Sequence, residues 1–576
     1  MTFPTPYQQL PKDVKLLLSD KKTVVKLSME AEEMATWWAE VEVQEFGLKE
    51  IVRRNFWAEF RKRLENSEHR ARIHELSDLD FSHIRSHLEK VKEEKRNRPN
   101  ELKKKEAEER AKVNGAFQFC LFDGSVEKVA NYNIEPPGIF RGRGEHPHMG
   151  KIKSRVVPEY VTINTGHDDP IPPCPIAGHN WKRIVSNTEC TWLCNFRDEK
   201  NTYMSTRKYL FLAAESRIKG ENDRNKYERA RRLKDKIQEI RAAYEKDMVQ
   251  TAHFDRNQLG VATYLIDKLA LRVGNEKGED EADTVGCCSL RVEHITLNEE
   301  RQEVTFDFLG KDSMRYLNTV PVTPPVFKLL QRFKKVVKEG RLVDKGPKDD
   351  LFEQINASKL NDYLKQHMND LSAKVFRTYN ASVTLQTQLE GSETAKRVGR
   401  DTNVDSKVKF YNDCNREVAL LCNHKKAESK NLKDQLKRLE DLIGEKRKEV
   451  KQLQAHLKKL EGGGKEGAGK EGAKTAASKR KAKASEKEEA ELPKSGEAVK
   501  SKLKKLGEQI KQKTLELEGK RQNAEVALGT SKINYMDPRI TISWCKQQEV
   551  PIEKIFPKTL RNKFAWAMDN QLEWKF

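Results

Sequence analysis

A tyrosine near the end of the chain has the neighbours that a phosphoryl-transfer nucleophile needs. The sequence Ser-Lys-Ile-Asn-Tyr-Met-Asp-Pro-Arg-Ile covers residues 531–540 and places Tyr535 among amide and cationic side chains. A phenol is mostly protonated at neutral pH, but neighbouring cations favour its nucleophilic phenolate. Taken alone, a tyrosine beside an Asp-Pro turn is more often a packed, hydrogen-bonded residue, so the rest of the chain must decide.

Four basic residues elsewhere in the chain could supply positive charge to such a reaction. Three lie where a helix or hairpin is expected to end or turn, and one lies on a predicted helix. Arg272 follows an apolar helical run, and Gly274 is expected to terminate that helix. We expect Lys311 at a hairpin tip, Arg377 on a helix and His424 at a helix end. A phosphoryl transition state spreads negative charge over its oxygens, so fixed cations are its chief requirement. The simpler alternatives are a solubilising lysine on the hairpin and a histidine that caps its helix.

The loop of residues 135–150 combines arginine with glycine in Phe-Arg-Gly-Arg-Gly. Glycines let the backbone approach a ligand closely, while guanidinium forks can face phosphate. Pro147 occupies the place of the third glycine in a dinucleotide-binding fingerprint, so that function is not indicated. A solvated loop is the alternative interpretation.

The remaining motifs predict neither a cofactor nor a metal. Residues 464–470 have Walker A spacing, but Glu471 replaces the hydroxyl residue that would hold magnesium, and no strand precedes them. The nine cysteines lie among apolar residues and are expected to be reduced thiols. One cluster of possible zinc ligands has a spacing that matches no zinc pattern. It consists of Cys174, His179, Cys190 and Cys194.

The charge balance indicates a polyanionic partner. The 576 residues include 110 Lys and Arg against 89 Asp and Glu, a formal net charge of +21. Such an excess of cations favours binding to nucleic acid, because the cations release counterions from its phosphate backbone. An acidic membrane surface would also attract a chain with this net charge. No apolar run approaches the roughly 18 residues of a spanning helix, and no secretory pattern opens the chain. We therefore expect a soluble intracellular protein.

Patterns along the chain predict an α+β protein of several domains. Residues 29–64 have helical spacing, with an aromatic core of Trp37, Trp38, Phe56, Trp57 and Phe60. Further helices are expected at 101–112, where the helix is solvated, and at 224–248, 258–271, 361–389 and 408–421. Strands are expected at 290–297, 303–309 and 314–320. The predicted domains are 1–98 (mixed helix and strand), 99–215 (β-rich), 216–425 (mainly helical), 426–525 (linker) and 526–576 (small and helical, carrying the tyrosine).

Two heptad segments flank a low-complexity stretch in the predicted linker. Apolar residues follow 4-3 spacing over 432–460 and again over 499–524. Each narrow stripe can be buried only against the other or against a partner, so we expect an antiparallel coiled hairpin. Residues 462–498 are mostly Gly, Ala, Lys and Glu and are expected to be disordered. Pairing of the helices would let His424 and Tyr535 share one site.

The chain resembles the eukaryotic DNA topoisomerase I family, the type IB enzymes. The resemblance extends from Tyr-Gln-Gln-Leu-Pro at residues 7–11 to the end of the chain. Its most specific blocks are 134–150, 265–277, 283–294, 306–316, 374–382, 420–424 and 531–567.

The resemblance implies a catalytic role for five residues. Tyr535 would cut one DNA strand and become linked to its 3′ phosphate. Arg272, Arg377 and His424 would bind the non-bridging oxygens, and Lys311 would protonate the departing 5′ oxygen. Exchange of a phosphodiester for a phosphotyrosine conserves one ester bond, so religation needs no ATP. Cations would replace the two metal ions that many nucleases use, so neither cofactor nor metal is expected.

The family also implies a bilobed clamp around double-stranded DNA, with basic linker helices beside the downstream duplex. Rotation of the cut strand would relax supercoils of either sign, with contacts mainly to phosphates and little sequence preference. A monomer in the nucleus, in nucleoplasm and nucleolus, is implied. The positions that match DNA contacts are Arg143, Lys208, Tyr209, Lys226, Val273, Gly274, Asn275, Glu276, Lys277, Thr284, Asp312, Asn361, Ser372, Ala373, Lys374 and Asn534.

Two features depart from the family pattern. The long charged N-terminal tail that carries nuclear targeting in the family has no counterpart here, which predicts a truncated or unusual form. The Gly-rich middle of the linker predicts a looser hairpin than the family has.

Two other functions stay open. A tyrosine site-specific recombinase uses the same residue types, but it usually has histidine three residues before its second arginine, where Lys374 stands here. Relaxation of a plasmid that lacks a target site would separate the two. A non-catalytic chromatin or RNA scaffold would bind nucleic acid through the basic surface, and Tyr535→Phe would leave that binding unchanged.

Overall fold

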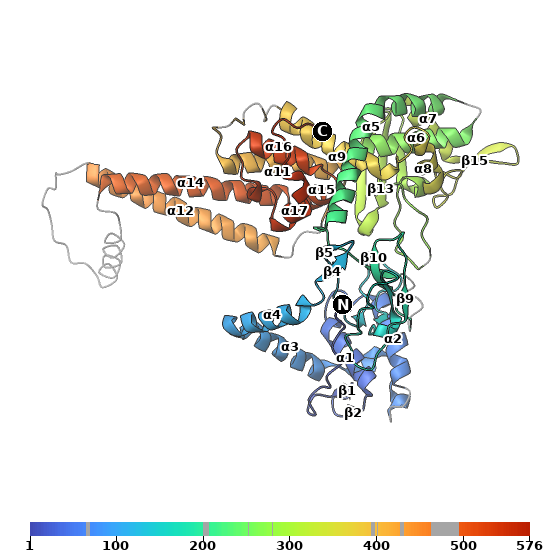
Figure 1. Ribbon diagram of the computed structural model, residues 1–576, viewed down its shortest axis with the longest axis vertical. Coiled ribbons are helices and arrows are strands. Elements are labelled where there is room, and N and C mark those ends of the chain that lie inside the picture. The colour runs from blue at the N-terminus through green and yellow to red at the C-terminus, as the bar shows by residue number, and fades with distance from the viewer. Residues whose placement is uncertain are drawn as a thin grey trace. The chain divides into compact units, whose positions relative to one another are not determined.

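The chain forms mixed helix and sheet, as the predicted α+β class requires (Figure 1). The computed structural model describes residues 1–576 apart from 65–68, 200–206, 251–252, 279, 393–394, 396–397, 400, 427–430 and 462–494. The Walker-like residues 464–471 and most of the predicted disordered stretch therefore lie outside the described residues. The contacts divide the chain into two compact units. Unit 1 comprises Met1–Ile266, Leu271–Lys374 and Thr559–Trp566, and unit 2 comprises Asp267–Ala270, Val375–Lys558 and Ala567–Phe576.

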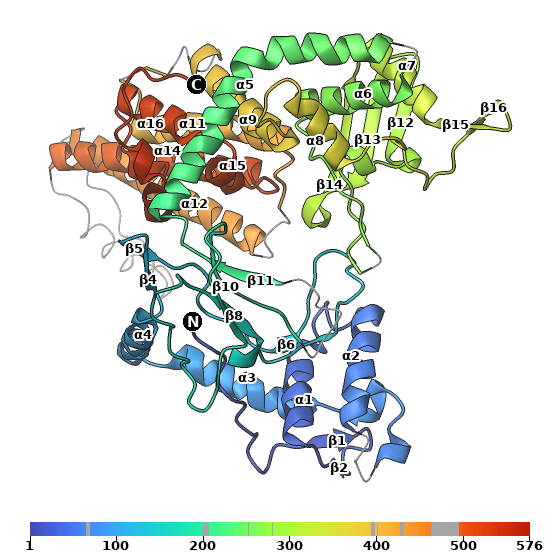
Figure 2. The ribbon, with the colours of Figure 1, turned by 45° about the vertical axis from the view of Figure 1, so that its right-hand side comes forward.

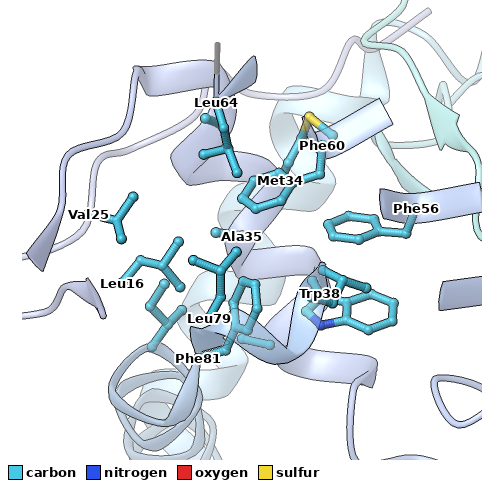
Figure 3. Close-up of a cluster of buried hydrophobic side chains, with 14 of the residues drawn as sticks. Leu16, Val25, Met34, Ala35, Trp38, Phe56, Phe60, Leu64, Leu79 and Phe81 are labelled. Atoms are coloured by element: carbon cyan, nitrogen blue, oxygen red, sulfur yellow. The ribbon is translucent and has the colours of Figure 1, made fainter. Parts of the chain in front are cut away.

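The aromatic core predicted near the N-terminus is confirmed in unit 1. Helices α1 (Met29–Val41) and α2 (Glu50–Arg63) pack so that the rings of Trp38 and Phe56 stack with centroids 4.5 Å apart (Figure 3). Trp37 and Trp57 are partly buried at its edge. A sheet of order β2-β1-β3 covers this core, and its strands are Val24–Val25, Leu16–Leu18 and Leu79–Asp80. Helix α3 (Ser82–Asn97) follows, and α4 (Asn100–Gly115) buries no residue, as its charge pattern predicts.

The β-rich segment before residue 212 is also confirmed. Its main sheet has the order β11-β10-β8-β9, with only β8 and β9 parallel. Strands β8, β10 and β11 of this sheet are seen together in Figure 2. The antiparallel pairs β4-β5 and β6-β7 precede this sheet along the chain. The strands are β4 Phe119–Phe122, β5 Ser125–Lys128, β6 Gly138–Ile139, β7 Ile152–Lys153, β8 Val161–Asn164, β9 Arg183–Val185, β10 Trp192–Phe196 and β11 Lys208–Phe211.

Helices α5 (Arg217–Val249) and α6 (Phe254–Leu269) match the two predicted in this region and pack closely, because a Cβ on Gly260 would lie 2.9 Å from the Tyr244 carbonyl oxygen. A three-stranded meander of order β12-β13-β14 follows, with strands Ile295–Asn298, Glu303–Leu309 and Arg315–Pro321. Beyond it lie α7 (Pro324–Phe333), the hairpin β15 (Lys335–Lys338) and β16 (Arg341–Asp344), and α8 (Ala357–Lys365).

Two predicted elements in this region were wrong in extent. The strand expected from residue 290 begins only at Ile295, because the N–H groups of Val292 and Glu293 donate to the loop carbonyls of Asp349 and Pro347. The single helix expected over 361–389 is two helices, α8 and α9 (Ala373–Gly391). The Asn361 side chain accepts the Ala373 N–H at 3.0 Å, which fixes the start of the second helix.

In unit 2, α11 (Val404–Leu421) precedes two long helices, α12 (Leu432–Glu461) and α14 (Gly496–Gln522), that pack in opposite directions. Leu439 and Ile443 of α12 contact Leu517, and Leu453 contacts Val499 and Leu506. Residues 496–498, predicted to be disordered, begin α14 because the Ser495 side chain caps it. The ends of the pair meet as predicted, since the Ala527 N–H donates to the His424 carbonyl at 2.7 Å.

The last part of the chain is helical, as expected. Its helices are, in chain order, α15 (Leu528–Asn534), α16 (Pro538–Gln547) and α17 (Lys558–Lys563). Tyr535 directly follows α15, and Pro538 supplies the first residue of α16. Across the described ranges, we find no helix both long enough and apolar enough to cross a membrane.

Candidate active site

Three of the five predicted catalytic residues come together within unit 2. The guanidinium carbon of Arg377 lies 5.2 Å from the centroid of the Tyr535 ring, and the His424 ring stacks on that ring with centroids 5.1 Å apart. Arg377 comes from α9, His424 follows α11, and Tyr535 follows α15. Arg377 and His424 are 7% and 6% exposed, while Tyr535 is half-buried. The ring of a phenol thus lies beside both a fixed cation and an imidazole.

Main-chain carbonyls hold the Arg377 guanidinium. Its Nη1 donates to the Ala270 carbonyl at 2.6 Å, and its Nη2 donates to the Cys422 carbonyl. Ala270 has a left-handed backbone, with φ of 51°, directly after the end of α6. These two neutral acceptors orient the guanidinium without cancelling its charge, so the charge stays available to an anion.

His424 is held by a turn and by a serine. Asn423 takes a left-handed conformation with φ of 50°, and the His424 N–H donates to the Ala419 carbonyl at 2.8 Å. The Nδ1 atom of His424 lies 2.7 Å from Oγ of Ser531, which is fully buried. The ring therefore has a hydrogen-bond partner from α15, the helix that leads to Tyr535. The backbone of His424 does cap the end of α11, as the alternative expected, and its side chain makes the additional contact with Ser531.

A second serine and an ion pair hold the backbone after Tyr535. The Ser382 hydroxyl donates to the Tyr535 carbonyl at 3.4 Å and accepts the Asp537 N–H at 3.0 Å. The buried Asp537 carboxylate caps α16 and pairs with Arg539 at 2.8 Å. The predictions assigned no role to these supporting residues. The Ser-Lys-Ile-Asn-Tyr motif contained Ser531, but nothing local in the sequence signals its contact with His424.

Arg272 lies in unit 1, in a loop whose backbone is fixed by a pair of glycines. The N–H of Cys287 donates to the Arg272 carbonyl at 2.8 Å. A Cβ on Gly286 would lie 2.5 Å from the Gly274 Cα, and Gly274 itself has a φ of 79°. The prediction that Gly274 terminates α6 was wrong, because that helix ends at Leu269. Its glycine is needed for the close approach to Gly286 instead.

Lys311 lies at the tip of the β13-β14 hairpin of unit 1, as predicted, and it is exposed. The strands pair in register up to Leu309 and Arg315, and Asp312 turns the chain with a φ of 64°. Asp312 pairs with Arg143 of the glycine-arginine loop. A Cβ on Gly144 would overlap the Ser313 side chain, so this loop contacts the hairpin tip directly.

Several cations that match DNA-contact positions pair with carboxylates. Lys208 bonds to Glu135 at 2.8 Å, Lys226 to Asp223 at 3.2 Å, and Lys277 to Glu281 at 3.2 Å. Burial would raise the pKa of Glu135, but hydrogen bonds from Lys153 and Lys208 outweigh it and lower that pKa to about 2. These carboxylates hold the cations in place.

The other candidate DNA-contact residues lie in loops and at element ends. Asn275 and Glu276 are exposed, whereas the Val273 carbonyl accepts the Cys288 N–H at 2.7 Å. Tyr209 is 41% exposed on β11. Ser372 and Thr284 are half-buried, Ala373 and Lys374 begin α9 beside Asn361, and Asn534 is exposed directly before Tyr535.

All nine cysteines are free thiols, as predicted. Of the residues tested for zinc, His179 pairs through Nδ1 with Glu159 at 3.0 Å, and Cys190 donates to the Asn187 carbonyl at 3.4 Å. Within the described ranges, no group of three or more His, Cys, Asp or Glu residues is arranged to hold a metal ion.

Comparison with known families defines the class. The profile of the eukaryotic DNA topoisomerase I catalytic core matches residues 215–457, that of its DNA binding fragment matches 1–212, and that of the C-terminal topoisomerase domain matches 507–576. These are parts of an enzyme that acts on DNA. The chain belongs to the eukaryotic DNA topoisomerase I family, as the resemblance predicted.

Individual relatives support the same assignment. Human DNA topoisomerase 1 is 43% identical over 98% of this chain and 69% of its own length. DNA topoisomerase 1 beta of Arabidopsis thaliana is 43% identical over 100% of this chain and 58% of its own length. The mitochondrial DNA topoisomerase I of Pan troglodytes is 41% identical over 98% of this chain and 88% of its own length.

Proposed function

We propose that the chain relaxes supercoiled DNA by the type IB mechanism, without ATP or a metal ion. Tyr535 attacks a backbone phosphate, the 5′ oxygen leaves, and a 3′-phosphotyrosine forms. The observation that carries the proposal is the contact of the Tyr535 ring with both Arg377 and His424 in unit 2. A scaffold that only binds nucleic acid has no need to fix a phenol beside these two groups.

Arg377 and His424 stabilise the pentacoordinate transition state at phosphorus. The Arg377 guanidinium can donate a planar pair of N–H groups to the non-bridging oxygens, and His424 can donate one more. Arg272 is the proposed second guanidinium. Its backbone follows Ala270 by two residues, and the Ala270 carbonyl accepts from Arg377. Fixed donors of this kind need no rearrangement as the charge develops.

Lys311 is the proposed general acid. Its exposed position at a hairpin tip suits a side chain that reaches into a DNA groove to protonate the departing 5′ oxygen. In religation the same lysine would take that proton back, as the 5′ hydroxyl attacks the phosphotyrosine. One ester bond replaces another at each step, so no external energy is required.

Double-stranded DNA is the proposed substrate, held as a duplex inside a bilobed clamp by a monomer. The net charge of +21 and the basic residues at DNA-contact positions favour phosphate contacts with little sequence preference. Strand rotation between cleavage and religation would remove supercoils of either sign. We propose a nuclear location, which imaging of a tagged chain tests, and an exclusively mitochondrial signal would contradict it.

The decisive assay uses supercoiled plasmid in EDTA without ATP, with no specific target site. We expect the wild-type chain to relax both positively and negatively supercoiled plasmid, and Tyr535→Phe to relax neither. A requirement for one target sequence would favour a recombinase. Equal plasmid binding by both proteins, with no relaxation by either, would favour a non-catalytic scaffold.

A further inference from the structure

We propose that Ser531 is a positioning residue for the cleavage reaction. Its hydroxyl sets the orientation and the proton position of His424, while its carbonyl fixes the backbone of Tyr535. The inference rests on the proposed function, because it matters only if His424 and Tyr535 act at the same phosphate.

Ser531 contacts both residues at once. Its Oγ lies 2.7 Å from Nδ1 of His424, which is 107 positions away in the sequence. Its carbonyl accepts the N–H groups of Tyr535 and Met536, both at 3.0 Å. Ser531 is fully buried, so water does not compete for these bonds. A single residue therefore links the imidazole to the start of the tyrosine turn.

We assign the Ser531 hydroxyl as the donor to Nδ1, and this assignment sets which His424 nitrogen carries a proton. A neutral imidazole has one N–H, and a hydroxyl that donates to Nδ1 requires that N–H to be on Nε2. Nε2 can then donate to a phosphate oxygen. With the other tautomer, Nε2 would present a lone pair to that oxygen and repel it. A hydroxyl can also accept from Nδ1 when the ring gains a second proton, so Ser531 supports the ring in both states.

Like Ser382 and Ser543, Ser531 does not donate its hydroxyl within its own helix. Buried hydroxyls on helices commonly bond to the carbonyl four residues back. Thr263 does so to Leu259, and Thr514 does so to Ile510, both at 2.8 Å. Ser531 directs its hydroxyl across to His424 instead. The bond serves the neighbouring ring rather than the helix itself.

The test compares Ser531→Ala, Ser531→Thr and the control Ser543→Ala. Ser543 is a buried serine on α16 whose hydroxyl donates to the Leu572 carbonyl. The measurements are the single-turnover rate of covalent adduct formation on a nicked oligonucleotide duplex, the Kd for that duplex by fluorescence anisotropy, and Tm. We expect Ser531→Ala to cleave about 10–100 times more slowly with an unchanged Kd, because misorientation of one group costs about that much. Ser531→Thr should recover most of the rate, and Ser543→Ala should cleave within about twofold of wild type.

A spectroscopic readout separates positioning from mere packing. In protein with 15N-labelled histidine, the His424 resonances are assigned by their loss in His424→Gln. Ser531→Ala should move the Nε2 resonance from the protonated toward the unprotonated range, and Ser531→Thr should not. An unchanged spectrum and unchanged rate in Ser531→Ala would overturn the inference. So would a rate loss that only parallels a fall in Tm. Adduct formation by Tyr535→Phe would instead overturn the proposed function.

Discussion

Arg377 and Arg272 are positioned in opposite ways. Arg377 is a buried side chain on a helix, and its guanidinium is oriented by two carbonyl acceptors. Arg272 lies in a loop whose backbone is fixed by the contact of Gly274 with Gly286. The first arrangement depends on hydrogen bonds made by the guanidinium itself. The second depends on the absence of a Cβ at a residue that carries no chemistry.

The largest effect should come from the buried arginine. Arg377→Ala removes a charged donor from the transition state, so we expect the single-turnover cleavage rate to fall about 10³-fold. It also leaves the Ala270 and Cys422 carbonyls without this donor, so Tm is measured alongside. Arg377→Lys keeps the charge but cannot reach both carbonyls, and it should cleave at an intermediate rate. Full cleavage activity in Arg377→Ala would remove the residue from the proposed site.

A smaller loss of cleavage rate should follow from disrupting the contact between Gly274 and Gly286. A Cβ in Gly286→Ala would meet the Gly274 Cα at 2.5 Å and the Arg272 carbonyl oxygen at 2.8 Å, so the loop must shift. We expect cleavage about 10–100 times slower, with DNA affinity changed far less. Gly278→Ala is the matched control, because a Cβ there meets nothing within 4 Å. Equal rates for the two variants would show that Arg272 does not depend on this contact.

The smallest effect should come from a carboxylate that competes with DNA. Glu135→Gln removes the partner of Lys208, so we expect duplex affinity to rise about threefold at low salt and the salt dependence to steepen. Glu159→Gln, whose partner His179 matches no DNA-contact position, should change neither quantity. Weaker binding by Glu135→Gln would mean that the carboxylate positions Lys208 rather than competing with phosphate.

The same variant tests a pH dependence of stability. The pKa of Glu135 is lowered from 4.5 to about 2 in the folded chain. The carboxylate therefore contributes stability that is present above about pH 4.5 and is lost as the pH falls toward 2. Glu135→Gln should flatten that part of the curve of unfolding free energy against pH. An identical pH curve for the two proteins would contradict the ion-pair assignment.

Local patterns predicted much of this architecture. Helical spacing located α1, α2, α5, α11 and the heptad helices, and alternation located the hairpin that carries Lys311. These features depend on which residues are neighbours in the chain, so the sequence displays them directly. The pairing of the heptad stripes then followed from the need to bury them, and it brought residues 424 and 527 together.

Contacts between distant segments could not be predicted in the same way. Gly274 was assigned to a helix end because nothing nearby in the sequence reveals Gly286 beside it. The left-handed turn at Ala270, which ends α6 without a glycine, has no local signature either. The link from Ser531 to His424 joins side chains more than a hundred residues apart in the chain. Nothing in the sequence around a buried serine shows which distant side chain it will contact. Family resemblance predicted which residues are catalytic, whereas the residues that support them are visible only in the fold.

The central claim is that Tyr535 becomes covalently joined to DNA. Its most direct test is mass spectrometry of protein trapped on a nicked duplex and digested to peptides. We predict a nucleotide attached through its 3′ phosphate to the peptide that contains Tyr535, and no adduct from Tyr535→Phe. An adduct on a different residue, or a link to the 5′ side of the break, would contradict the account.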